Sequence, residues 1–226
     1  MRKTHHFLLI ASLLLLGWVF SPLPLAQAGQ LYSVSLDTSP LIGHSEGPFY
    51  LEFQLNDGSG TGDGNNTVTL SDFQFGIGGS AVGNPITEGG VTGSLTTGVV
   101  ITDSDFFNSF YEEFTPGALL SFMLEIMTQV DAITPDQFSF AILFLDALMD
   151  PVEIPTFGPA NALLTIDIAA PNLIVQTFAS NPAEFPSIAL DAPMVIPVPG
   201  TLALLLVGMG GLLRFGKRVT TARRAH

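Results

Sequence analysis

The sequence predicts an all-β domain built as a single two-sheet β-sandwich, with a targeting segment at each end of the chain. Two observations predict this fold class. Apolar residues recur at every second position in many stretches, and clusters of Gly, Asn, Asp and Pro interrupt these stretches at short intervals. Strands that bury one face and expose the other, and that are joined by turns, form β-sandwiches. Among sandwiches we expect a jelly-roll-like arrangement rather than an immunoglobulin-like one.

The period-two alternation defines the expected strands. It extends over residues 49–55, 120–126 and 164–168, and over shorter stretches at 32–36, 67–70 and 73–75. Residues 138–145 begin in the same way and then run apolar, as a strand buried on both faces does. Residues 173–178 complete the predicted set.

One segment favours a helical turn instead. Phenylalanines at positions 106, 107, 110 and 114 follow the i, i+3/i+4 spacing that places apolar side chains on one helical face. We therefore expect a helical turn over residues 105–114, ended by Pro116 and Gly117.

The N-terminal residues 1–28 have the three parts of a secretory signal peptide. Arg2 and Lys3 supply the positive charge, residues 7–20 are apolar, and Ala26-Gln27-Ala28 is a small-x-small cleavage site. Cleavage after Ala28 leaves Gly29 as the first residue of the mature chain. The alternative is an N-terminal transmembrane anchor, but the short apolar region and the cleavage site argue against it.

The C-terminal residues 194–226 have a second tripartite pattern. A rigid motif, Pro197-Val198-Pro199-Gly200, precedes the uncharged residues 201–213. About 20 residues, counted from Met194, are compatible with a bilayer core. A basic cluster follows, which the positive-inside rule keeps cytoplasmic: Arg214, Lys217, Arg218, Arg223 and Arg224. Residues 29–193 are then expected to form an ectodomain outside the membrane.

The C-terminal pattern resembles the PEP-CTERM sorting signal of Gram-negative bacteria. Pro197 and Pro199 match the motif prolines, and a transmembrane segment and an arginine-rich end follow in the same order. Val198 stands where the family usually has Glu, and Gly200 stands where Ala is common. The resemblance covers about 30 of the 226 residues. The alternative is a plain single-span tail anchor.

The resemblance implies a route and a role. In the PEP-CTERM family an exosortase, an inner-membrane protease, recognises and cleaves the tail. The released protein is then exported or attached at the cell surface, commonly in bacteria that make exopolysaccharide. The chain is therefore expected to be a non-enzymatic surface or extracellular-matrix protein, held in the inner membrane until it is processed. The alternatives are a glycan-binding module and a calcium-dependent adhesion protein.

The charge distribution restricts the partners of the ectodomain. All seven Lys and Arg residues lie in the two terminal segments, whereas all twenty Asp and Glu residues lie between Asp37 and Asp191. The ectodomain therefore carries a charge of −20, from 20 acidic and no Lys or Arg side chains. Because nucleic acids bind proteins chiefly through cationic side chains, a nucleic-acid partner is excluded. The chain has no cysteine, so an exported domain must depend on its hydrophobic core.

A loop at residues 56–66 is the one metal-site candidate. Asp57, Asp63 and Asn65 offer the oxygen ligands that Ca²⁺ prefers, on a glycine-rich backbone. The loop matches neither an EF-hand nor a glycine-aspartate calcium repeat. A glycine-rich connection without metal is the favoured interpretation, so no cofactor is required.

Two further residues are candidates for binding or catalysis. Tyr50 falls on the polar side of its alternating strand, where its ring could stack on a glycan, although an ordinary exposed tyrosine is the simpler interpretation. His44 is the one histidine between the terminal segments, and it lies in a Gly-His-Ser-Glu-Gly turn without a nucleophile motif. The sequence therefore offers no catalytic residue, and we expect no enzymatic activity.

Overall fold

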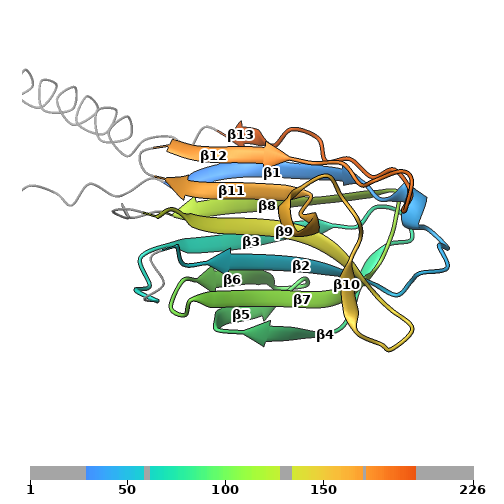
Figure 1. Ribbon diagram of the computed structural model, residues 1–226, viewed down its shortest axis with the longest axis horizontal. Helices are drawn as coiled ribbons and strands as arrows, with labels where there is room; N and C mark the ends of the chain where they lie inside the picture. The colour runs from blue at the N-terminus through green and yellow to red at the C-terminus, as the bar shows by residue number, and fades with distance from the viewer. Residues whose placement is uncertain (1–28, 59–61, 128–133, 170–171, 197–226) are drawn as a thin grey trace, which may run out of the picture.

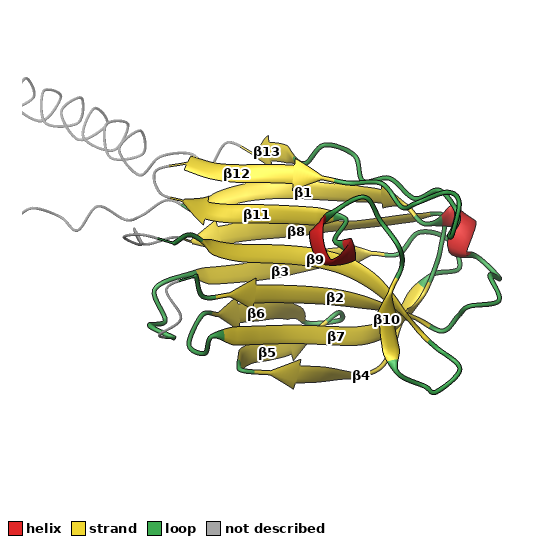
Figure 2. Ribbon diagram, viewed as in Figure 1, coloured by secondary structure: helices red, strands yellow, loops and turns green. Residues whose placement is uncertain are grey.

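Two antiparallel sheets lie face to face and contain more than half of the described residues (Figure 1). The computed structural model describes residues 29–58, 62–127, 134–169 and 172–196. The strands are β1 (Gln30–Asp37), β2 (Phe49–Asn56), β3 (Thr67–Gln74), β4 (Ser80–Glu88), β5 (Gly90–Ser94), β6 (Gly98–Thr102), β7 (Phe107–Thr115), β8 (Leu119–Met127), β9 (Asp136–Leu145), β10 (Pro151–Glu153), β11 (Leu164–Ala169), β12 (Asn172–Thr177) and β13 (Met194–Ile196). In this part of the chain the helices are two short 3-10 turns, η1 (Ser39–Leu41) and η2 (Pro159–Asn161) (Figure 2).

The strand order defines the two layers of the sandwich. One sheet has the order β13-β1-β8-β3-β6-β5, and the other has the order β12-β11-β9-β2-β7-β4, with β10 paired to β9. The expected β-sandwich is thus confirmed at the level of its two sheets. Every predicted strand is present, and residues 67–70 and 73–75 belong to the single strand β3.

The alternation in the sequence matches burial in the structure. Along β2, buried and half-buried residues alternate without interruption, and β8 alternates in the same way between its two exposed end residues. Phe53 is central to the core between the sheets and is 0 % exposed. Its ring lies 5.2–6.3 Å, centroid to centroid, from five other phenylalanine rings: Phe73, Phe110, Phe122, Phe138 and Phe140. Such aromatic packing suits a domain without disulfides.

An irregularity in β3 explains why its alternation changes phase. The register against β8 shifts between Ser71 and Gln74, and Asp72 adopts a φ of 54°. Val68 and Leu70 are buried before the shift, and Phe73 packs against the core after it. One extra residue therefore moves the apolar set from even to odd positions without leaving the core face.

The predicted helical turn at 105–114 is wrong, because residues 107–114 of this segment belong to the strand β7 and residues 105 and 106 form a bend before it. β7 pairs with β2 on one side and with β4 on the other. Its buried alternate positions hold Asn108, Phe110, Glu112 and Phe114. Two of these four side chains are polar, so the sequence of β7 shows no period-two alternation of apolar residues. The remaining pattern is the phenylalanine spacing, which suggested a helix.

The two ends of the described domain lie side by side. β13 pairs with the first residues of β1, and Leu31 faces Ile196. Met194–Ile196, expected to belong to the sorting segment, therefore form a strand of the sandwich. The length to compare with the thickness of a bilayer is therefore that of the uncharged stretch after Pro199, not of the residues from 194 onward.

Candidate functional site

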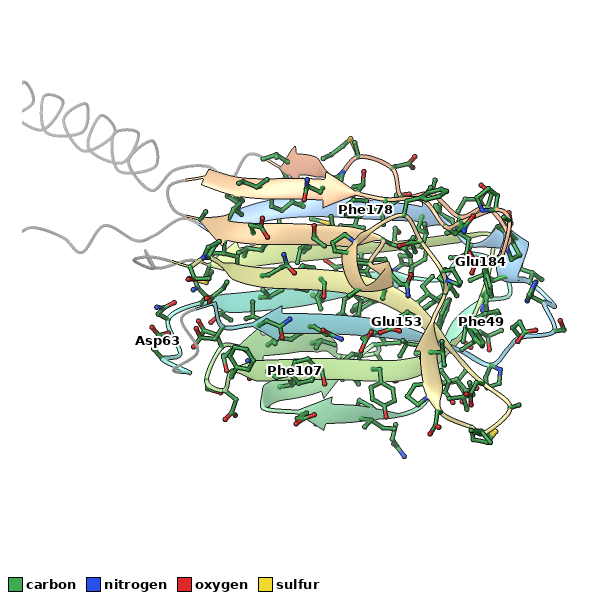
Figure 3. All side chains as sticks on the ribbon, in the orientation of Figure 1. Phe49, Asp63, Phe107, Glu153, Phe178 and Glu184 are labelled. Atoms are coloured by element: carbon green, nitrogen blue, oxygen red, sulfur yellow. The ribbon has the colours of Figure 1, made fainter. Side chains whose placement is uncertain are left out.

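Three buried aspartates converge at the end of the sandwich where β1 begins. Asp57 follows β2, Asp103 follows β6 and Asp136 opens β9, and each is at most 1 % exposed. Together with the buried Asn66 we call them the carboxylate pole. Figure 3 labels Asp63 at this end of the molecule, whereas Phe49 and Glu184 lie at the opposite end.

Asn66 is the centre of the carboxylate pole. Its backbone N–H donates to both carboxylate oxygens of Asp103, at 3.1 and 3.0 Å, and its side-chain amide donates to Oδ2 of Asp136 at 2.8 Å. The backbone N–H of Gly58 donates to the other oxygen of Asp136 at 2.8 Å. These bonds tie the 57–66 loop to the loops that precede β7 and β9.

The pole changes the acidity of one of its members. Burial, a hydrogen bond to the Asp136 carboxyl and the charge of that carboxyl together raise the pKa of Asp103 from 3.8 to about 7, against the opposing effect of the Asn66 N–H. No Lys or Arg lies among the described residues to neutralise the pair. Asp103 therefore keeps its proton at mildly acid pH, where its carboxyl is hydrogen-bonded to that of Asp136. Because both are 0 % exposed, their role is to join loops rather than to meet a substrate.

The predicted calcium ligands are separated by their burial. Asp57 is buried and accepts a hydrogen bond from the Gly62 N–H, whereas Asp63 is exposed and accepts hydrogen bonds from Asn65. Among the residues that the structure describes, no group of three or more His, Cys, Asp or Glu side chains is arranged to hold a metal ion. The calcium site stays a prediction.

The sequence did not identify Asp103, Asp136 or Asn66 as members of a common site. Each is an ordinary strand-end polar residue, and their separations in the chain are 37 residues for Asn66 and Asp103 and 70 for Asn66 and Asp136. The sequence does show several acids at the ends of strands in a domain without Lys or Arg. These acids can be recognised as a cluster only once the strand order is known.

A fourth buried acid lies within the sandwich. Glu112 of β7 accepts a hydrogen bond from the Leu95 backbone N–H at 2.8 Å. Burial raises the pKa of Glu112, and the Leu95 N–H partly opposes that shift. The carboxyl thereby fixes the turn between β5 and β6 to the facing sheet.

Tyr50, the predicted glycan-stacking residue, has a second tyrosine beside it. The rings of Tyr50 and Tyr111 lie 6.2 Å apart, edge to face, on neighbouring strands β2 and β7. Both are half-buried. Burial, the nearby Glu113 carboxylate and Tyr111 raise the pKa of Tyr50. Glu52, next along the same face, accepts a hydrogen bond from Gln54 at 2.8 Å.

His44 packs against aromatic rings at the end opposite the carboxylate pole. Its ring centroid lies 5.0 Å from that of Phe185 and 6.2 Å from that of Phe49. Its Nδ1 accepts a hydrogen bond from the Glu46 N–H at 3.3 Å. These contacts give the side chain a packing role in its turn.

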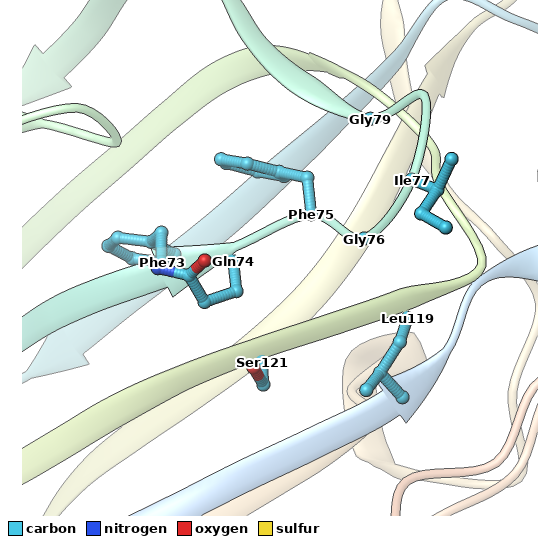
Figure 4. Close-up of a pocket in the computed structure, with 8 residues that line it drawn as sticks. All are labelled: Phe73, Gln74, Phe75, Gly76, Ile77, Gly79, Leu119 and Ser121. Atoms are coloured by element: carbon cyan, nitrogen blue, oxygen red, sulfur yellow. The ribbon is translucent and has the colours of Figure 1, made fainter.

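A shallow hollow of about 440 Å³ lies where β3 ends beside the start of β8 (Figure 4). Its lining is Phe73, Gln74, Phe75, Gly76, Ile77, Gly79, Leu119 and Ser121. None of these side chains titrates in the physiological range, so the hollow has no acid, base or charged ligand to offer.

The targeting residues lie outside the described part of the chain. This applies to the cleavage-site residues Ala26 and Ala28, to the Pro197–Gly200 motif and to the basic cluster from Arg214 to Arg224. Within the described ranges, no helix has the length and apolar character needed to cross a bilayer. Comparisons of the chain with family models, with curated proteins and with solved structures found no match.

Proposed function

We propose that the protein is a non-enzymatic component of the cell surface or extracellular matrix, exported by its signal peptide and released by an exosortase-like protease. The position of the folded domain between the two targeting segments carries this proposal. β1 begins at Gln30, just after the expected cut, and β13 ends at Ile196, just before Pro197. Cuts at both places would leave every described strand intact.

The pairing of the chain ends gives further support. Because Leu31 faces Ile196, both targeting segments leave the sandwich from the same end. A domain tethered at this end would have its opposite end farthest from the membrane and its outer sheet faces exposed at its sides. Such a domain is suited to surface exposure before and after release.

We also propose that the sandwich is a jelly roll, a fold common among lectin and capsid domains. The strand order supports it: β1, β8, β3 and β6 form one layer, and β2, β7 and β4 form the facing one. Successive strands from β1 to β8 therefore cross from sheet to sheet, as two interlocked Greek keys require, except that β5 and β6 form a hairpin within one sheet. β9, β11 and β12 extend the second sheet beyond this arrangement.

The mature mass and the cellular fraction test the sorting proposal. A species that starts at Gly29 and ends between Pro197 and Gly200, outside the inner membrane, is expected. Changing both Pro197→Ala and Pro199→Ala should hold the protein in the inner membrane, whereas Pro193→Ala, outside the motif, should not. An intact C-terminus at His226 in the unmodified protein would refute release and leave the plain tail anchor.

A second candidate function, glycan binding, is favoured by the Tyr50–Tyr111 pair. Two aromatic rings on one sheet face can stack on sugar rings, while neighbouring carboxylate and amide groups can bond to hydroxyls. The domain charge of −20 favours a neutral glycan. Binding of the neutral exopolysaccharide fraction should be lost in Tyr50→Ala and Tyr111→Ala and largely kept in Tyr50→Phe. Equal binding by all four proteins would exclude this face.

A further inference from the structure

The edge strands of the two sheets differ in how open they are to another strand. β12 and β4 bound one sheet, and β13 and β5 bound the other. An edge strand presents unpaired backbone N–H and C=O groups, and natural proteins block such edges with short strands, prolines, charges or bulges.

Three of these four edges are blocked. β13 has three residues and is followed by Pro197. β5 has five residues, of which Gly93 adopts a φ of 101°. β4 contains Pro85, and its register against β7 shifts between Val82 and Ile86. Each feature interrupts the regular row of donors and acceptors that an added strand needs.

β12 has none of these features. Its six residues, Asn-Leu-Ile-Val-Gln-Thr, contain no charge, proline or glycine, and they pair with β11 in an unbroken register. Among the described residues, its backbone makes no hydrogen bond except in that pairing. Ile174 points away from the core and is 51 % exposed. β12 is therefore a regular, uncharged and unprotected edge.

We propose that two copies of this chain associate through β12, which pairs antiparallel with its counterpart about a two-fold axis to form one continuous sheet. In an antiparallel pair, directly opposed side chains share a face, so a residue can oppose its own copy. Centring the pair on Ile174 places it against Ile174 of the second copy. Leu173 then opposes Val175 of the second copy on the core side.

The charge distribution disfavours contact between two copies except at an uncharged edge such as this one. Two domains of −20 repel over most of their surfaces. The acid nearest to Ile174 along the ladder is its cross-strand neighbour Asp167. In the paired arrangement, Asp167 and its copy lie three strand spacings apart, about 14 Å. That separation exceeds the Debye length of about 8 Å at physiological ionic strength, so their repulsion is largely screened.

The size of the contact sets its strength. A six-residue strand is ~20 Å long and stacked sheets lie ~10 Å apart, so pairing through this edge, flanking side chains included, buries no more than about 400 Å² per partner. A standard stable interface buries roughly 800 Å² per partner. The association is therefore expected to be reversible and dependent on concentration, and to form most readily where copies are crowded at a surface.

A cysteine trap tests the pairing directly, because the chain contains no cysteine. Full-length protein with Ile174→Cys is compared, in the same detergent, with Thr92→Cys on the exposed edge strand β5. Thiols held together in a complex react at a far higher effective concentration than free ones. The Ile174→Cys protein should form a disulfide dimer at least about tenfold faster. Equal rates would overturn the proposal, and dimerisation through the tail alone would raise both rates alike.

A matched pair of lysine variants tests the same edge without cross-linking. Ile174 and Ile86 are 51 % and 52 % exposed and lie on opposite edges of the same sheet. In sedimentation at rising concentration, the parent and Ile86→Lys should dimerise, while Ile174→Lys should stay monomeric. The lysine introduced in place of Ile174 would face Asp167, an attraction that helps to keep the monomer folded. A parent that stays monomeric throughout, or an Ile174→Lys protein that dimerises like the parent, would refute the proposal.

Discussion

Replacing Asp103 by asparagine should remove the part of the pH dependence of stability that this buried carboxyl contributes. In the variant, the side-chain oxygen can still accept from the Asn66 N–H, and the new amide can donate to the Asp136 carboxylate. The substituted side chain therefore reproduces the protonated form of Asp103 at every pH. The variant should match the parent in acid and be more stable than it at neutral and alkaline pH.

The sign follows from the raised pKa of Asp103. Its ordinary value is 3.8, and the folded value is about 7. Between these values the folded state binds more protons than the unfolded state, so the free energy of unfolding falls as the pH rises. Above about pH 7 both states are ionised and the loss is complete.

The magnitude follows from the same two values. A shift of about 3 pKa units corresponds to roughly 4 kcal/mol at 1.36 kcal/mol per unit. Between pH 5 and pH 8 the parent should lose about 3 kcal/mol through this group, because two of those units lie above pH 5. Asp103→Asn should lose none of it.

Urea unfolding followed by circular dichroism at pH 5 and pH 8 measures the difference. Asp105→Asn is the control, because it removes the same formal charge from an exposed position in the same loop. That control should retain the pH dependence of the parent. The reasoning is refuted if Asp103→Asn and the parent lose equal free energy between pH 5 and pH 8, or if the variant is the less stable protein at pH 8.

Three further changes probe the core, the second buried acid and the predicted loop site. Phe53→Ala should lower the free energy of unfolding by about 3–5 kcal/mol and the Tm by roughly 10 °C, measured calorimetrically, because it empties the centre of the aromatic core. Glu112→Gln should keep or raise stability at pH 7, since Gln can still accept from the Leu95 N–H, whereas Glu112→Ala should cost about 1–3 kcal/mol by leaving that N–H without an acceptor. The calcium hypothesis predicts that millimolar CaCl₂ raises the Tm and that Asp57→Ala with Asp63→Ala removes the rise; an unresponsive parent protein would rule it out.

The strands that have one buried face and one exposed face could be predicted from the sequence. In β2, and over residues 120–126 of β8, every second residue is apolar and most of the residues between them are polar, and the structure buries the apolar set. Six strands fell outside the predicted set, namely β4, β5, β6, β7, β10 and β13. β4 is almost wholly exposed or half-buried, and β5 is rich in glycine, so neither carries the apolar period that identifies a strand.

β7 was missed for a different reason. Its alternate positions are buried, but Asn108 and Glu112 occupy two of them. Asn108 donates to the Leu55 carbonyl and accepts from the Gly90 N–H, so its polarity is satisfied by chain segments far away in sequence. Local pattern alone cannot distinguish such a residue from one that faces water. The partners that make it a buried residue are supplied by the fold.

The carboxylate pole and the open edge of β12 have a common physical origin. A domain without Lys or Arg cannot neutralise a buried acid with an ion pair, so Asp103 and Asp136 depend on backbone donors, on Asn66 and on the raised pKa of Asp103. The same lack of cations means that a partner copy finds no opposite charge anywhere on the described surface. Association must therefore use backbone hydrogen bonds and apolar contact where no carboxylate stands directly opposite another. Of the four edges, β12 is the one whose sequence and register meet that condition, and acid conditions that lower the domain charge should strengthen the pairing.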